Sequence, residues 1–105
     1  MLATTDIMTR LSEVKGKTAA ALRAAEADRG ASVVTVAVVK EFDSKADKAG
    51  RSSDGDAAAR DSVIELEQAG DSAKAAAEAD PGIGAEALDA VQAAHLAICI
   101  LKTEV

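Results

Sequence analysis

Residues 33–49, VVTVAVVKEFDSKADKA, decide the fold class of this chain. Six of the first seven are β-branched, which favours a β-strand. The later apolar residues recur instead at spacings of three and four, namely Val39, Phe42, Ala46 and Ala49. That is the spacing of one helix face, and the chain contains no second β-rich run with which a strand could pair. We therefore predict a helix over residues 32–49 with Ser32 as its N-cap, while a strand over residues 33–39 remains the alternative.

Three other stretches show the same helical spacing. Upstream, residues 5–29 carry an apolar face formed by Ile7, Leu11, Val14, Thr18, Ala21 and Ala25. Downstream, residues 54–79 carry a face of smaller residues, which are Ala59, Val63, Leu66, Gly70, Ala73 and Ala77. Residues 84–103 carry Leu88, Val91, His95 and Ile98 on one face, and residues 96–101, LAICIL, are apolar all round. Each of these faces is typical of an amphipathic helix.

Glycine and proline mark the connections between the four segments. Residues 50–56 are rich in glycine and serine, and Pro81 ends the third segment at or before Asp80. Because short connections place consecutive helices side by side, we predict an all-α fold, an antiparallel four-helix bundle made of two helical hairpins. The predicted helices are about 5–29, 32–49, 54–79 and 84–103, within a single domain over residues 1–105. No internal repeat is evident.

Gly70 lies inside the third predicted helix, where it costs about 1 kcal/mol relative to alanine. The close approach of another helix would explain this glycine, because Ala73 and Ala77 continue the same face with small side chains. The alternative is that residues 70–72 form a turn that divides the segment into two shorter helices. Both interpretations stay open at this point.

The composition excludes several classes of function. About a quarter of the residues are alanine and Phe42 is the only aromatic residue, so the chain lacks the aromatic side chains that line ligand pockets and stack on bases. A net charge of −6 makes nucleic acid an improbable partner. The apolar runs are too short to span a bilayer, and one cysteine cannot form an internal disulfide, so we expect a cytoplasmic protein.

Charge is distributed unevenly between the two halves of the chain. Residues 1–52 contain nine Lys and Arg against seven Asp and Glu, whereas residues 53–105 contain three against eleven. The halves carry opposite net charge and should attract each other, within one chain or between chains. An alanine-rich core also buries little area per residue, which favours stabilisation by oligomerisation.

His95 and Cys99 are the one residue pair that suggests chemistry. They lie four residues apart on the last predicted helix, hence on one face, and imidazole and thiolate are good ligands for zinc or copper. Two ligands do not make a site. The chain has no other histidine or cysteine, so a metal site would need carboxylates or a second subunit. The competing interpretation is a histidine and a small apolar cysteine packed in a bundle.

Other reactions lack the residues that they need. Phosphotransfer through His95 requires an exposed imidazole, and its neighbours here are hydrophobic. A di-iron centre requires two Glu-x-x-His pairs, but the chain has one histidine. Cys99 lies in a Leu/Ile-rich stretch that favours an inert thiol. We interpret the carboxylates Asp61, Glu65 and Glu67 as a solvated helix face, and we expect no catalytic or cofactor-binding residue.

The sequence therefore predicts a non-enzymatic helical interaction module, a homo-oligomeric structural, adaptor or small regulatory protein. Its partner would be a second copy or another helical protein. The helix faces expected to carry the interaction are Ala59, Val63, Leu66, Gly70, Ala73, Ala77, Leu88, Val91, Ile98 and Leu101. The alternative function is a metal-responsive sensor, in which His95 and Cys99 bind zinc or copper at a subunit interface.

Overall fold

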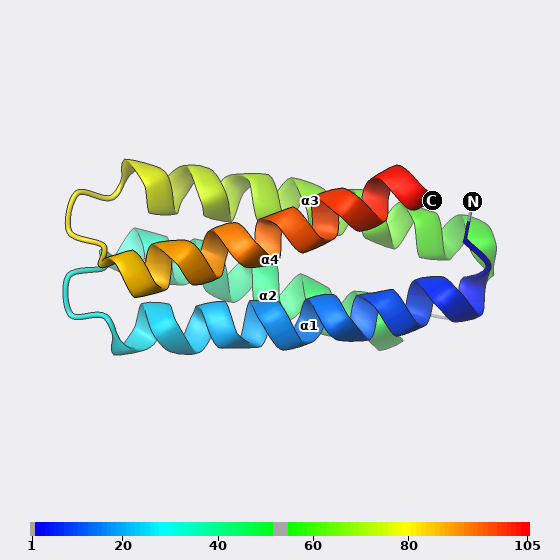
Figure 1. Cartoon of the computed structure of the whole chain (residues 1–105), viewed down its shortest axis with the longest axis horizontal. Coiled ribbons are helices and arrows are strands. Elements are labelled where there is room, and N and C mark those ends of the chain that lie inside the picture. Colours follow the sequence, from blue (N-terminus) through cyan, green and yellow to red (C-terminus); the bar gives the residue numbers. More distant parts are fainter. Residues whose placement is uncertain (1, 52–54) are drawn as a thin grey trace.

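The computed structural model describes residues 2–51 and 55–105, which form four α-helices and no strand. These helices are α1 (Thr4–Ala27), α2 (Val33–Arg51), α3 (Asp56–Ala79) and α4 (Ala85–Glu104). Each helix packs on the next one along the chain, and α4 also packs on α1 (Figure 1). The predicted all-α, antiparallel four-helix bundle is confirmed. No helix in the described parts of the chain is long and apolar enough to cross a membrane.

The segment that decided the fold class is helical throughout. α2 begins at Val33, so the strand alternative for residues 33–39 is wrong. The first two valines are 86% and 68% exposed, because they lie in the first turn and outside the core. Ser32 caps the helix as predicted, since its Oγ accepts the backbone N–H of Thr35 at 3.2 Å. The start predicted at residue 54 for the third helix lies outside the described residues.

Phe42 fills the centre of a core that otherwise contains mainly Ala, Val, Leu and Ile. Its side chain is fully buried, and it lies opposite Gly70 on the neighbouring helix α3. α3 is continuous through Gly70, so a turn at residues 70–72 is excluded. A Cβ at Gly70 would lie 3.0 Å from Phe42 Cζ and 3.2 Å from Ile98 Cγ2. The glycine therefore makes room for two side chains, whereas we had expected it to admit a helix backbone.

The helix faces that we expected to carry an interaction with a partner lie inside the bundle. Nine of the ten residues are buried in this single chain, namely Ala59, Val63, Leu66, Gly70, Ala73, Ala77, Val91, Ile98 and Leu101, and Leu88 is partly buried against them. Their small size allows four helices of one chain to pack together. A second protein could reach them only if the bundle opened, so this assignment of the interaction faces is corrected.

The chain contains an internal repeat that the sequence analysis missed. Residues 24–30, AAEADRG, and residues 76–82, AAEADPG, differ at one position only. They end α1 and α3, which have 24 residues each and begin 52 positions apart. The same shift of 52 positions places every buried residue of α1 and α2 on a buried residue of α3 or α4. The two hairpins, α1–α2 and α3–α4, are therefore two versions of one helix pair.

The connections of the two hairpins meet at one end of the bundle, where each caps the other (Figure 1). Asp28 accepts the backbone N–H of Gly84 at 2.6 Å, just before α4. Asp80 accepts the N–H of Ser32 at 2.8 Å and the hydroxyl of Thr35 at 2.7 Å, at the start of α2. These donors, first the Ser32 N–H, lower the pKa of Asp80. The two aspartates thus link the hairpins through helix N-termini.

Gly30 and Gly82 allow this mutual capping. A Cβ on either glycine would overlap the backbone carbonyl of the other, so at these two positions the loops touch backbone to backbone. Neither glycine has a positive φ, and the requirement for glycine is therefore purely steric. The N–H of Gly82 is donated to Asp80, and that of Gly84 to Asp28. These glycine N–H groups thus bind the chain's own carboxylates.

Candidate metal centre

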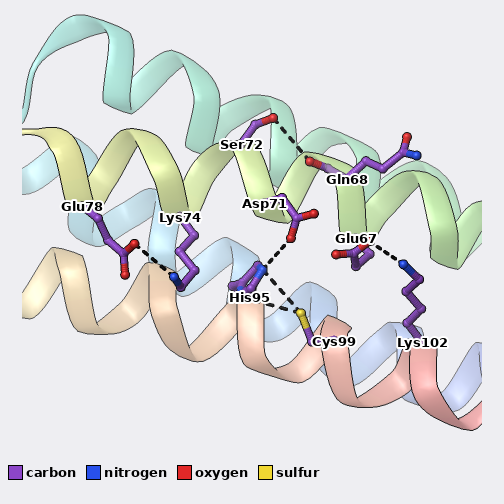
Figure 2. Close-up of polar contacts among 9 residues, drawn as sticks. All are labelled: Glu67, Gln68, Asp71, Ser72, Lys74, Glu78, His95, Cys99 and Lys102. Atoms are coloured by element: carbon purple, nitrogen blue, oxygen red, sulfur yellow. Dashed lines mark hydrogen bonds and ion pairs between the residues drawn. The ribbon is translucent and has the colours of Figure 1, made fainter.

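Helices α3 and α4 run antiparallel and bring two pairs of polar side chains together beside the core. Glu67 and Asp71 come from consecutive turns of α3, and His95 and Cys99 from consecutive turns of α4. Figure 2 shows Asp71 and His95 pointing toward each other across the gap between the helices, with Cys99 next to the imidazole. Each residue is adjacent to a core position on its helix, so the four side chains lie at the edge of the hydrophobic core.

The four side chains offer one ligand atom each, and these atoms lie within 4.8 Å of one another. His95 Nε2 is 2.7 Å from Asp71 Oδ1 and 3.4 Å from Cys99 Sγ. Zinc lies about 2.0–2.3 Å from nitrogen, oxygen and sulfur ligands, so atoms of one tetrahedral shell are about 3.3–3.8 Å apart. The present spacing, at most 4.8 Å, is therefore about 1 Å wider than the widest spacing in such a shell.

Lys102 forms the wall of the cluster on the side of the chain terminus. Its Nζ donates to Glu67 Oε1 at 2.9 Å, and this carboxylate raises the pKa of Lys102. The ion pair fixes one oxygen of Glu67 and leaves the other oxygen for a further ligand. Glu67 itself is 9% exposed, which makes it the one carboxylate in the buried set of the described residues. A buried carboxylate is costly unless a cation lies beside it.

Solvent reaches the cluster from the side of Asp71. The Asp71 side chain is 56% exposed and that of His95 is 17% exposed. Cys99 is half-buried between them and the core. The cluster is therefore exposed to solvent mainly at Asp71, and less at His95.

The electrostatics of the cluster hold the thiol in its neutral form. Burial, followed by the negative charges of Glu67 and Asp71, raises the pKa of Cys99. The hydrogen bond with His95, the largest cause, lowers the pKa of Asp71. Asp71 therefore stays ionised, while the thiol keeps its proton unless a cation replaces it.

The first hairpin has a closed ion pair at the equivalent place. Lys15 and Asp43 occupy the positions that correspond to Glu67 and His95, and Lys15 Nζ lies 2.7 Å from Asp43 Oδ1. The buried hydroxyl of Thr18 also donates to Asp43, at 2.8 Å. This pair balances its own charge. The second hairpin has instead two carboxylates, an imidazole and a thiol, a set that is suited to a cation.

The sequence predicted half of this cluster. The placement of His95 and Cys99 on one helix face was correct, whereas the assignment of Glu67 to a solvated face was wrong. Asp61 and Glu65 are exposed, but Glu67 turns toward α4. The carboxylates that a metal would need come from the same chain, so no second subunit is required. The available signal was the spacing of four between Glu67 and Asp71, which matches that between His95 and Cys99.

The geometry is unlike that of a cysteine nucleophile with a histidine base. In a catalytic triad with a cysteine nucleophile, the thiol contacts one ring nitrogen of the histidine and the orienting carboxylate contacts the other. Here Cys99 and Asp71 both approach Nε2 of His95, and the distance from Sγ to Nδ1 is 3.8 Å. The raised pKa of the thiol also opposes attack by a thiolate. Asp71 and Cys99 both contact Nε2 of His95. A bound ion would take the place of these two contacts.

No family model, curated protein or solved structure matches this chain.

Proposed function

We propose that this chain is a non-enzymatic, metal-binding helical protein whose site consists of Glu67, Asp71, His95 and Cys99. One observation carries the proposal, namely that two helices place four ligand atoms of suitable chemistry within 4.8 Å of one another. The cluster carries an excess of negative charge and a protonated thiol, and a cation would remedy both. The ion would connect α3 to α4 at mid-length.

Zn²⁺ suits this ligand set best. Thiolate, imidazole and carboxylate are its usual ligands, and it accepts four of them in a tetrahedral shell. Cu⁺ prefers sulfur to carboxylate, and Ca²⁺ and Mg²⁺ prefer shells of oxygen alone. With a thiolate and two carboxylates, the bound Zn²⁺ would leave one negative charge, which Lys102 balances from the opposite side of Glu67. The alternative metal, copper, is therefore less well matched than zinc.

Metal binding would be coupled to the stability of the bundle. An ion that binds only the folded chain stabilises it by about 2.7 kcal/mol at a free concentration one hundred times the dissociation constant. That is a large fraction of the stability of a small domain. A regulatory protein could use this coupling to report metal, because α3 and α4 would be held together only when the ion is bound.

The first prediction concerns metal affinity. The purified, reduced chain is expected to bind one Zn²⁺, and Co²⁺ is expected to give a sulfur charge-transfer band in the near ultraviolet. Trp and Tyr are absent, so this band would have little protein background. Cys99→Ala and Glu67→Gln should each weaken Zn²⁺ binding at least about tenfold, measured by competition with a chromophoric chelator.

Glu65→Gln is the matched control for this measurement. Glu65 is an exposed carboxylate on α3, two residues before Glu67, and it lies outside the cluster. This variant should bind Zn²⁺ as the unmodified chain does. Equal weakening in Glu65→Gln and Glu67→Gln would show non-specific attraction to an acidic surface and would overturn the proposed site. Absence of binding at micromolar Zn²⁺ would do the same.

The second prediction is a pH dependence of the same affinity. Because the pKa of Cys99 is raised, the thiol is protonated near neutral pH and must lose its proton when it binds the metal. Because one proton is released, the affinity for Zn²⁺ should rise by about tenfold per pH unit until the pH passes the pKa of the Cys99 thiol. Calorimetry in buffers of different ionisation enthalpy measures the proton released. Cys99→Ala should lose that proton, and an unchanged pH slope in this variant would contradict thiolate ligation.

We also propose association as a second function, in line with the expectation of a structural, adaptor or small regulatory protein. The observation that supports it is the exposure of two large apolar residues on one helix, Leu96 at 60% and Ile100 at 44%. Water-exposed side chains of this size, one turn apart, favour a protein partner. Light scattering of the purified chain tests this function, since a monomer at high concentration with no co-purifying protein would refute it.

A further inference from the structure

Helices α1 and α4 leave a short apolar strip on one side of the bundle, most of it exposed. The strip consists of Ala93, Leu96, Ala97 and Ile100, whose spacing of three and four continues along one face of α4. Beside it lies an open groove of about 350 Å³, and Arg10, Glu13, Val14 and Lys17 of α1 form its other wall. We refer to this strip and the groove wall together as the α1–α4 face. The faces expected on α3 and α4 are buried, apart from the partly buried Leu88, and share no residue with this surface.

The charged residues along the α1 side of this face alternate in sign. Asp6, Arg10, Glu13 and Lys17 follow one another at spacings of four, three and four, so they lie on one stripe of α1. If a second copy lies antiparallel across this stripe, Asp6 of each copy faces Lys17 of the other. Arg10 then faces Glu13 of the other copy. The order of charges is therefore complementary to itself under a two-fold rotation centred between residues 11 and 12.

Leu96 and Ile100, the two large side chains of the strip on α4, have their midpoint at residue 98, close to the same level of the bundle. Leu2 donates its N–H to the carbonyl of Glu104 at 3.1 Å, and Arg10 pairs with the Glu104 carboxylate. The two walls of the groove show the register directly, because residues 10–17 of α1 lie opposite residues 93–100 of α4. Because α1 and α4 are antiparallel and rise equally per residue, residues 11–12 lie level with residues 98–99.

The same two-fold axis therefore relates α1 to α1 and α4 to α4 of the two copies. A two-fold axis at the level of residues 11–12 crosses α4 between Leu96 and Ile100, so Leu96 of each copy would contact Ile100 of the other. The ion pairs on α1 and the apolar contacts on α4 form in the same register. Arg10 already pairs with Glu104 and, at 3.7 Å, with Glu13 of its own helix. A guanidinium has five N–H donors, so the Arg10 and Glu13 side chains of both copies would form one shared cluster of ion pairs across the axis.

We propose that the α1–α4 face is a homodimer interface in which a second copy packs antiparallel about this two-fold axis. This inference rests on the association function and does not involve the metal. The stripe contributes two positive and two negative charges, so it adds no net charge in a chain whose total is −6. The molecule measures 41 × 21 × 17 Å, and a long face of that size suits a standard interface of about 800 Å² per partner.

The test is the mass of the full chain by size-exclusion chromatography with light scattering, in EDTA so that metal cannot bridge chains. Refractive index serves as the concentration signal, because Trp and Tyr are absent. The unmodified chain should be a dimer, and Leu96→Glu should raise the dissociation constant at least tenfold. Ile64→Glu is the matched control, since Ile64 is 41% exposed on α3 and lies outside the face. Circular dichroism verifies that each variant is folded.

A pair of charge variants tests the register. Lys17→Glu and Asp6→Lys should each weaken the dimer, because each places like charges opposite one another twice. An equimolar mixture of the two variants should form a heterodimer with the affinity restored, because every facing pair is then again of opposite sign. Other registers and other partners do not predict this rescue.

The possible results distinguish association in general from association through the α1–α4 face. A chain that stays monomeric at several hundred micromolar overturns both the association function and this interface. A dimer that Leu96→Glu leaves intact, or charge variants that do not rescue each other, overturns this interface while association itself survives. Failure of Leu96→Glu to fold leaves the charge variants to decide, since both sites are exposed on α1.

Discussion

Phe42→Ala is expected to destabilise the fold by about 3–5 kcal/mol, most of the stability of a domain of this size. Phe42 is the largest fully buried side chain among the described residues, and it contacts α3 opposite Gly70. Gly70 lies opposite the ring and has no side chain that could fill the space that the ring leaves. Urea unfolding followed by circular dichroism at 222 nm measures the loss. Val34→Ala on the same helix is the control, since this valine is 68% exposed and should change stability little.

Substitution of Gly70 tests whether the stability contributed by Phe42 depends on its contact with that glycine. Gly70→Ala alone should be destabilising, because its methyl group would lie 3.0 Å from Phe42 Cζ and would overpack the core. In a Phe42→Leu background the contact with the ring is removed and only the end of the Ile98 side chain, Cγ2 at 3.2 Å, stays close. The same change should then stabilise by up to about 1 kcal/mol through helix propensity. The sign of the Gly70→Ala effect should therefore reverse. Equal effects in both backgrounds would show that the two residues do not share the space.

Gly82→Ala is expected to cost about 2–4 kcal/mol, because its methyl group would collide with the backbone of Gly30. A backbone collision cannot be relieved by a change of rotamer, so the two loops must separate. Separation would break the hydrogen bonds that Asp28 and Asp80 make across the loops, and each such cap is worth about 0.5–2 kcal/mol. Gly30→Ala should have a similar effect, since the contact is mutual.

Gly16→Ala is the matched control for the loop substitution. Gly16 is an exposed residue in the interior of α1, and a Cβ there would meet nothing within 4 Å. This variant should gain about 0.5–1 kcal/mol, because alanine has the higher helix propensity. A Gly→Ala substitution is thus expected to lower the free energy of unfolding at Gly82 and to raise it at Gly16. A neutral Gly82→Ala would mean that the hairpins are not locked at this end.

The helices could be predicted from the sequence because their signals are local. The spacing of three and four between apolar residues depends only on the helix repeat, and it located the buried residues of α1, α2 and α3. Even the β-branched segment at residues 33–39 was assigned correctly from the residues that follow it. Ser32 and Pro81 marked helix ends through their own backbone chemistry.

The functional surfaces could not be predicted in the same way, because periodicity does not say which helix lies opposite which. Glu67 has the same local environment as Glu65 in the sequence, yet only Glu67 turns toward Lys102 and the cluster of His95 and Cys99. The stripe on α3 was correctly recognised as a packing face, but its partner proved to be the same chain. Exposure of Leu96 and Ile100 likewise depends on which side of α4 the other three helices cover.

The sequence by itself determined four amphipathic helices, their approximate bounds and their assembly into a bundle, since these follow from helical spacing and from the residues that start and stop helices. Only the tertiary structure decided that the two hairpins cap each other through Asp28 and Asp80, that Glu67 and Asp71 join His95 and Cys99, and that the α1–α4 face stays open. The physical reason is that these contacts join residues far apart in the chain. They depend on the register and the rotation of each packed helix, which no single helix fixes.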